Sequence, residues 1–284
     1  MGNKKVYLSS AILLLVAAAI GVGLWLQHRA EQKREERKNA IYGYWKTANL
    51  KSDIPLCIEI GKDRVVRSMA PTAPSHIGEV VPTIDEKGIV TLEVTMQPQS
   101  RNAPRLIDTF TLAPDDSLKM SSRFPGTTIT PPDVVLKRIT RKEYDDHWRP
   151  LDLSEWEKGK HFVDDDYTCF VSIKGISSDQ CYFMSVVKSS PQATVQAKSN
   201  WISAYKGAFC IAGSSGSQRF VRVYASLGEN KIYGHTERKT FHLLTPEEYK
   251  ANAERIFEIN ATGMNLTKQD LQRLRPILDS LFKE

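Results

Sequence analysis

The chain has 284 residues, of which 41% are hydrophobic and 25% charged, and its formal net charge is +6. These are ordinary globular values, and the length corresponds to one or two domains. Segments 1–5 and 27–40 hold seven basic and three acidic residues, which leaves about +2 for the remainder of the chain. A body this close to neutral argues against a nucleic-acid partner.

The N-terminal region predicts a membrane anchor. Residues 1–5 form a short polar tail, and residues 6–26 carry no ionisable side chain apart from Tyr7. A helix of that length rises about 30 Å, the thickness of a bilayer core. Tyr7 and Trp25 lie near its two ends, where amphipathic rings prefer the membrane interface. A cleaved signal peptide is the alternative, but the apolar run is long and the "QHRA" that follows is a poor cleavage site.

The segment after the anchor predicts a charged helical stalk over residues 27–40, because it has helix formers all round and no apolar stripe. A count of lysines and arginines on the two sides places the body in the cytoplasm. Three interleaved glutamates and a short tail with two lysines, typical of a signal anchor, favour the opposite orientation. We expect a single-pass membrane protein with an extracytoplasmic body and the lipid bilayer as one partner.

Residues 41–150 predict a first β unit. Short, β-branched runs that mostly alternate apolar and polar residues are separated by turn residues, which is typical of a small antiparallel barrel or sandwich. The runs are 56–60, 64–69, 78–85, 88–96, 106–112, 117–122 and 133–140. Thr140 and Glu143 then form a predicted capping box that opens a short helix.

Residues 151–244 predict a second β unit of the same kind, starting near His161. Thr245 and Glu248 form another predicted capping box, with Pro246 at the first helical position. The phrase "ITRKEY" (139–144) is therefore echoed by "LTPEEY" (244–249). The echo leaves two interpretations open, a duplicated unit or two unrelated β units that end alike.

Residues 245–284 predict a C-terminal helical pair, which makes the chain mainly β with an N-terminal transmembrane helix, and α+β overall. Thr267 and Asp270 cap the second helix, and its apolar stripe either packs on the chain's own β domain or offers a face to a partner protein. The stripe consists of Leu271, Leu274, Leu278 and Leu281.

The four cysteines have no CxxC spacing, so zinc and thioredoxin chemistry are not predicted. Small buried residues in strands are the favoured interpretation for Cys57, Cys169, Cys181 and Cys210, while their disulfide pairing stays open. His235 and His242 lie in adjacent predicted strands, a weak hint of a metal site, and we expect no metal and no cofactor.

The segment "IYGYWK" contains Gly43, Tyr44 and Trp45, a G-x-W pattern just before the first strand run. It resembles the signature of lipocalin-like barrels, in which the tryptophan plugs the closed end and an arginine from a late strand stacks across it. Arg138 stands where such an arginine would be. The resemblance covers residues 41–140, not the second unit, and implies a barrel that could hold a small apolar ligand.

No catalytic arrangement is evident. The segment "AGSSGSQ" (212–218) places its second glycine one position too early for a nucleophile elbow. We therefore expect a non-enzymatic binding or assembly protein of the cell envelope, with another membrane or envelope protein as its partner. The alternative is a membrane-tethered carrier of a lipid or other apolar ligand, and a membrane-tethered hydrolase is a third hypothesis.

Overall fold

The computed structural model describes residues 2–53, 55–68, 75–96, 105–151, 156–177, 180–228 and 230–282, without the side chains of residues 2–18 and 200–203. Contacts divide the chain into two compact units, and each is described by itself. One unit comprises Met1–Gly43, Glu59–Val66 and Pro74–Arg138, and the other comprises Tyr44–Ile58, Arg67–Ala73 and Ile139–Glu284.

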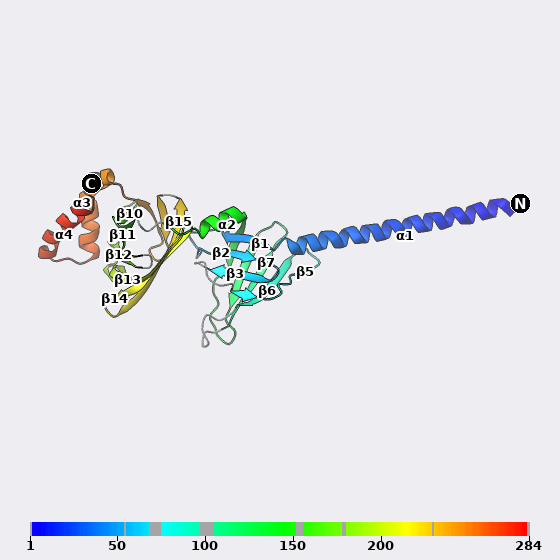
Figure 1. Ribbon diagram of the computed structural model, residues 1–284, viewed down its shortest axis with the longest axis horizontal. Helices are drawn as coiled ribbons and strands as arrows, with labels where there is room; N and C mark the ends of the chain where they lie inside the picture. The colour runs from blue at the N-terminus through cyan, green and yellow to red at the C-terminus, as the bar shows by residue number, and fades with distance from the viewer. Residues whose placement is uncertain are drawn as a thin grey trace. The chain divides into compact units, whose positions relative to one another are not determined.

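A single helix, α1 (Gly2–Asn39), runs without a break through the predicted tail, membrane segment and stalk (Figure 1). Within the part of the chain that the structure describes, no helix is long and apolar enough to cross a membrane. Most of the predicted membrane segment, up to residue 18, has side chains that lie outside the description.

The end of α1 is bound to the first β unit. Arg37 pairs with Asp116, with Nη1 2.5 Å from Oδ1, and its Nη2 donates to the carbonyl oxygen of Ala113. Arg34 Nη2 donates to the carbonyl oxygen of Ile84 at 3.0 Å. The stalk is therefore exposed as predicted through residue 36, whereas its last turn is fixed to loops of the β unit.

The first β body is a nine-stranded sheet with the order β4-β3-β2-β1-β9-β8-β7-β6-β5, so that the first strand pairs with the last. Across the remaining gap, Nδ1 of His76 in β4 lies 3.0 Å from the carbonyl oxygen of Thr95 in β6. The sheet thus curls into a half-barrel. Its strands are β1 (Gly43–Thr47), β2 (Cys57–Ile60), β3 (Arg64–Ser68), β4 (His76–Ile77), β5 (Thr83–Ile84), β6 (Val90–Met96), β7 (Leu106–Leu112), β8 (Leu118–Arg123) and β9 (Val134–Ile139).

The alternation of apolar and polar residues determines which face of each strand is buried. In β6, Val90, Leu92, Val94 and Met96 are buried and the residues between them face outward, as a half-buried strand requires. The predicted strand at 78–85 is wrong: only Thr83–Ile84 pairs there, as β5. Pro82 precedes it and has no N–H to donate to a neighbouring strand, which limits pairing at this point.

The second β body is a closed antiparallel barrel, β10 to β17, in which β10 also pairs with β17. Its interior is filled by a single cluster of buried side chains that includes Phe183, Phe209, Tyr224 and Phe241. Of the two architectures predicted for this region, a small antiparallel barrel or a sandwich, the structure shows the barrel. Its strands are β10 (Lys160–Asp164), β11 (Cys169–Gly175), β12 (Cys181–Val187), β13 (Val195–Ala204), β14 (Ala208–Ser215), β15 (Gln218–Gly228), β16 (Lys231–Gly234) and β17 (Lys239–Leu243), with a short 3-10 helix η2 (Pro191–Ala193) before β13.

Two features of the barrel do not follow from its local sequence. Residues 201–213 form one mostly apolar run, yet they cross a hairpin, because β13 ends at Ala204 and β14 begins at Ala208. Strand β10 is not evident in the sequence, because its last residue, Asp164, is acidic. Asp164 is nevertheless buried, because its carboxylate accepts from Lys239 Nζ at 2.6 Å and from the backbone N–H groups of Thr168 and Cys169.

Each β body is followed by helical structure. Helix α2 (Arg141–His147) follows the sheet, and helices α3 (Pro246–Gly263) and α4 (Lys268–Leu281) follow the barrel. The capping box of Thr140 and Glu143 is confirmed, as is the box of α4. Thr245 caps α3 through Oγ1, which accepts from the N–H of Glu248 at 3.2 Å. The Glu248 carboxylate, predicted to complete that box, instead accepts from Tyr167 and hydrogen-bonds His242 Nε2, at 2.7 and 2.6 Å.

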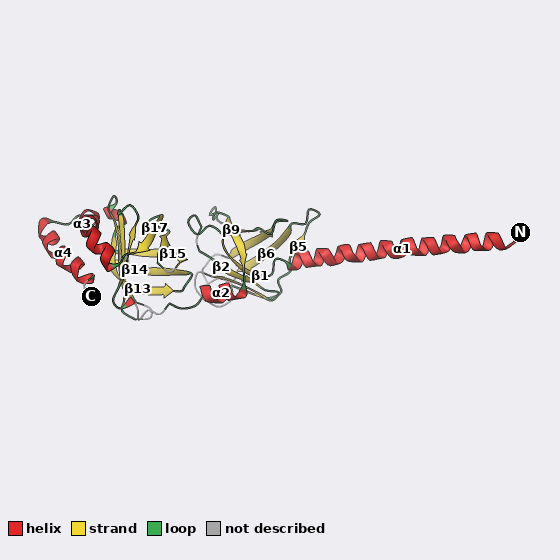
Figure 2. Ribbon diagram, turned by 90° about the horizontal axis from the view of Figure 1, so that it is seen from above, coloured by secondary structure: helices red, strands yellow, loops and turns green. Residues whose placement is uncertain are grey.

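The helical pair packs on part of the outer face of the barrel (Figure 2). Leu278 is buried, and Leu274 and Leu281 pack against the same cluster, which includes Val163 and Phe170 of the barrel. Leu278 therefore serves the chain's own core, while Leu274 and Leu281 pack against that core and stay partly exposed. Leu271 lies outside that cluster and lines a surface recess with Phe257 and Arg275.

All four cysteines are buried, free and located in strands, as the favoured interpretation predicted. Burial raises the pKa of Cys57 to about 12 and the pKa values of Cys169 and Cys210 to about 11. The thiols are therefore protonated at neutral pH and shielded from reagents in the folded chain.

Candidate functional site

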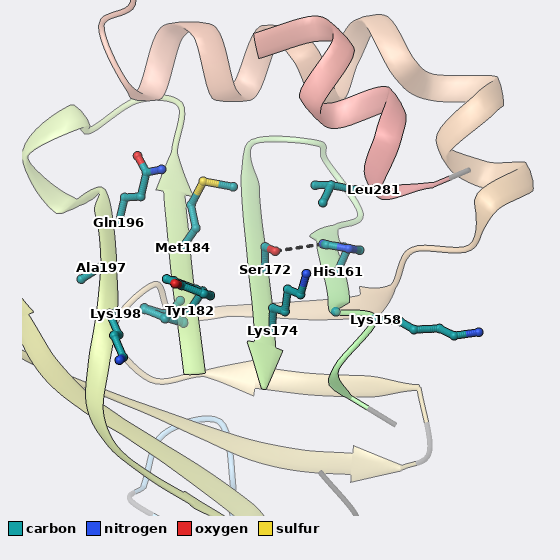
Figure 3. Close-up of a pocket in the computed structure, with 12 residues that line it drawn as sticks. Lys158, His161, Ser172, Lys174, Tyr182, Met184, Gln196, Ala197, Lys198 and Leu281 are labelled. Atoms are coloured by element: carbon teal, nitrogen blue, oxygen red, sulfur yellow. Dashed lines mark hydrogen bonds between the residues drawn. The ribbon is translucent and has the colours of Figure 1, made fainter. Parts of the chain in front are cut away.

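A recess of about 510 Å³ lies on the outer face of the barrel, over β10 to β13 and beside the C-terminal end of α4 (Figure 3). We refer to it as the lysine groove, after Lys158, Lys174 and Lys198 on its walls.

Strand register builds the floor of the lysine groove. His161 pairs with Ser172, Ser172 with Met184, and Met184 with Gln196, so these four residues form one row across four strands. In the adjacent row, Tyr182 lies between Lys174 and Lys198. Because neighbouring residues of a strand point to opposite faces, the same strands send other side chains into the barrel core, including Val171, Ile173 and Phe183.

His161 is the buried polar residue of the groove, only 6% exposed. Its Nδ1 lies within hydrogen-bond distance of Ser172 Oγ, at 2.9 Å. The ring stacks parallel to Phe170, and its centroid is 4.8 Å from that of Phe282. Burial lowers the pKa of His161 to about 4, so the imidazole is neutral at physiological pH.

The positive charge of the groove comes from its three lysines, which are exposed. Within the described ranges, no carboxylate forms an ion pair with Lys158, Lys174 or Lys198. Figure 3 shows the amino group of Lys174 on the side of His161 and Ser172, that of Lys198 directed away from them, and that of Lys158 at the margin. The three charges are thus spread along the groove.

This arrangement suits binding better than catalysis. A serine nucleophile needs a histidine base that a third group orients. In the described part of the chain, His161 has Ser172 as its hydrogen-bond partner, and no carboxylate contacts it. A histidine with a pKa of about 4 is also a weak base at neutral pH.

The residues of the G-x-W segment lie elsewhere in the fold. Arg138 Nη1 donates to the carbonyl oxygen of Tyr42 at 3.1 Å, and its Nη2 donates to that of Ala40. Gly43 has a positive φ of 137°, and a Cβ there would lie 2.7 Å from Arg138 Nη1. Trp45 is fully buried. Gly43 and Arg138 therefore form one structural unit.

The hint of a metal site at His235 and His242 is wrong. His242 in β17 pairs with Lys231 and Val163, while His235 lies in the turn after β16. Among the residues that the structure describes, no three His, Cys, Asp or Glu side chains cluster as metal ligands would.

Sequence reasoning missed the lysine groove, although its signal was present. The outward positions of β11 and β12 alternate with core residues, so the patterns "FVSIK" and "CYFMSV" already separate Ser172, Lys174, Tyr182 and Met184 from the core. What the pattern could not show is which outward residues become neighbours across strands.

Comparisons of the chain with known protein families, with characterised proteins and with solved structures find no match. The class of protein is therefore defined by its fold: mainly β, with a half-barrel sheet, a closed eight-stranded barrel and, in the part of the chain that the structure describes, four α-helices, α+β overall.

Proposed function

We propose that the protein is a single-pass membrane-anchored, non-enzymatic binding or assembly protein whose β body lies outside the cytoplasm. The observation that carries the proposal is the continuity of α1. The helix that contains the apolar segment 6–26 is the same helix whose last turn is fixed to the β unit through Arg34 and Arg37. An anchor of this kind would hold the β unit at a defined distance from the bilayer.

The lysine groove supplies the binding surface for this function. It combines an open recess, an apolar contribution from Met184 and Leu281, and three lysines without carboxylate partners in the described chain. The neutral pair of His161 and Ser172 adds hydrogen-bonding capacity without adding charge. Concave sites with a few polar groups placed around apolar surface are typical of ligand recognition.

A carrier of a lipid or other small apolar ligand is the second candidate. The closed barrel does not favour it, because aromatic side chains fill its interior. The first β unit is the better candidate, since the pairing of β1 with β9 and the position of Arg138 over Gly43 support the lipocalin-like resemblance. Organic extraction of the purified chain followed by mass spectrometry tests it: a co-purifying lipid in stoichiometric amount supports a carrier, and its absence opposes one.

Topology is the direct test of the anchored function. Single cysteines at Thr128 and Ser189, both exposed, are labelled with a membrane-impermeant maleimide on intact cells and after lysis. The unmodified chain is the control, because its four thiols are buried. Labelling of Thr128→Cys and Ser189→Cys on intact cells, with the protein in the membrane fraction, supports the proposal. Labelling only after lysis contradicts the orientation, and recovery in the soluble fraction contradicts the anchor.

A further inference from the structure

We propose that the lysine groove binds an extended acidic peptide segment of a partner protein, with carboxylates spaced along the segment and an apolar residue between them. The inference rests on the proposed binding function and adds the chemistry of the partner. It is argued from the spacing of the charges, the direction of the lysines and the composition of the floor.

The spacing of the charges favours an extended ligand. Lys174 and Lys198 lie in the same row, on strands that flank β12, and Tyr182 separates them. Neighbouring strands are about 4.8 Å apart, so the two lysine backbones are about 10 Å apart. A peptide in the extended polyproline II conformation has three residues per turn and rises about 3.1 Å per residue, so carboxylates three positions apart lie on one side of it, about 9 Å apart, and match this distance.

The direction of the lysines argues against a single compact anion. In Figure 3 the amino groups of Lys158, Lys174 and Lys198 point different ways rather than toward one point. A phosphate group needs donors that converge on its oxygens. Separate carboxylates along a chain can meet each lysine where it lies.

The floor of the groove suits a peptide backbone with an apolar side chain. Met184 and Leu281 offer apolar contact between the charged residues. Methionine is flexible and polarizable, so it adapts to different side chains. Gln196 and the hydroxyl of Ser172 lie in the same row and provide donors and acceptors for peptide groups.

The probe is a fluorescent peptide of three Asp-Leu-Gly repeats, titrated against the full chain in detergent micelles and followed by anisotropy. We expect saturable binding that weakens about fivefold for Lys174→Glu and for Lys198→Glu, as expected for single exposed charge pairs. Lys231→Glu is the matched control, because Lys231 is an exposed barrel lysine outside the groove, and its effect should be small. The neutral variants Lys174→Gln and Lys198→Gln, both at exposed positions, should also weaken peptide binding, each by less than the corresponding Glu variant.

Two control peptides sharpen the test, one with Asn for Asp and one with Gly for Leu, and both should bind more weakly. The proposal is overturned if the Asp peptide does not bind, if Lys231→Glu weakens it as much as the groove variants, or if the Gly-for-Leu peptide binds equally well. Competition by millimolar inorganic phosphate at Lys174 and Lys198 would identify a compact anion site instead and also overturn it. The topology labelling is independent of this titration, so the anchored function and the peptide site can fail separately.

Discussion

Gly43 combines two constraints that only glycine satisfies. Its φ of 137° is a conformation that other residues rarely adopt, and the Arg138 guanidinium fills the space where a Cβ would stand. Gly43→Ala should therefore destabilise the fold by about 2 kcal/mol, measured by urea denaturation followed by tryptophan fluorescence.

Gly88→Ala is the control for this prediction, because Gly88 also has a positive φ, 78°, but open space at its Cβ position. If the clash with Arg138 matters, Gly43→Ala costs more than Gly88→Ala, and the difference shrinks in an Arg138→Ala background. Equal costs for the two glycines would show that Arg138 plays no part.

His147 and His161 make the stability of the protein depend on pH. Burial lowers the pKa of both to about 4, and for His147 the nearby Lys46 adds to the effect. An unfolded histidine has a pKa of about 6.5, so between pH 6.5 and 4 the unfolded chain binds more protons than the folded chain. Stability contributed by the neutral rings is complete above pH 6.5 and is lost as the pH falls toward 4, by at most about 3 kcal/mol for each histidine.

The expected measurement is a fall in Tm across this pH range that is less steep in His161→Phe and less steep again in the double variant with His147→Phe. Phenylalanine keeps the ring contacts with Phe170 and Phe282 while removing the titration. An unchanged slope in both variants would mean that other groups control the pH dependence.

At the scale of elements, substitutions in α4 show which leucines of the predicted stripe pack on the barrel. Leu278 is 1% exposed in the cluster between the helical pair and the barrel, whereas Leu271 lines a surface recess. Leu278→Ala should cost about 3 kcal/mol, since it removes a buried side chain and leaves a cavity. Leu271→Ala should cost less than about 1 kcal/mol, typical of a surface change.

Urea denaturation of the two leucine variants checks this prediction. Equal losses for Leu271→Ala and Leu278→Ala would contradict the packing of α4 on the barrel. A loss of stability in Leu271→Ala alone would also contradict this packing. The leucine stripe would then be free to contact a partner protein.

Local patterns predict the elements of this protein better than their assembly. Strand β7 matches its predicted run of 106–112, and Thr140 and Thr267 cap their helices as expected, because alternation and capping are properties of neighbouring residues. The acidic end of β10 is buried because Lys239 pairs with Asp164. The hairpin after Ala204 contains Gly207, which must be glycine because His147 occupies the space of a Cβ there. Local patterns predict neither feature. Both causes are contacts with residues far along the sequence.

The candidate site depends on register in the same way. Lys174, Tyr182 and Lys198 become neighbours only through the pairing of β11, β12 and β13. A shift of one residue would turn these side chains to the other face of the sheet. No short sequence window contains that information, so the lysine groove could not be predicted from sequence alone.

At the scale of the whole molecule, the two β bodies share a plan. In each, the first strand pairs with the last, and the last strand is followed closely by a threonine that caps a helix. The echo of residues 139–144 in 244–249 follows from this shared corner, since both need a cap after a closing strand. The plan is compatible with duplication, and helix capping alone also explains the shared motif.

The attachment of α1 decides whether the helix acts as a rigid arm or a loose tether. Arg37 makes three of the contacts, to Asp116 and to the carbonyl oxygens of Ala113 and Gly88, and its side chain is only 21% exposed. Arg37→Ala should therefore release the last turn of the helix from the β unit. The expected result is a broader distance distribution between spin labels at Ala30→Cys and Thr128→Cys, measured by pulsed electron resonance on the full chain in detergent.

Lys33→Ala is the matched control, because Lys33 is exposed on the same helix and forms no ion pair among the described residues. It should leave the distribution narrow. If Arg37→Ala also leaves it narrow, the arm is held by other contacts, such as the bond from Arg34 to the Ile84 carbonyl. If the distance distribution of the unmodified chain is already broad, α1 is a flexible tether rather than a rigid arm.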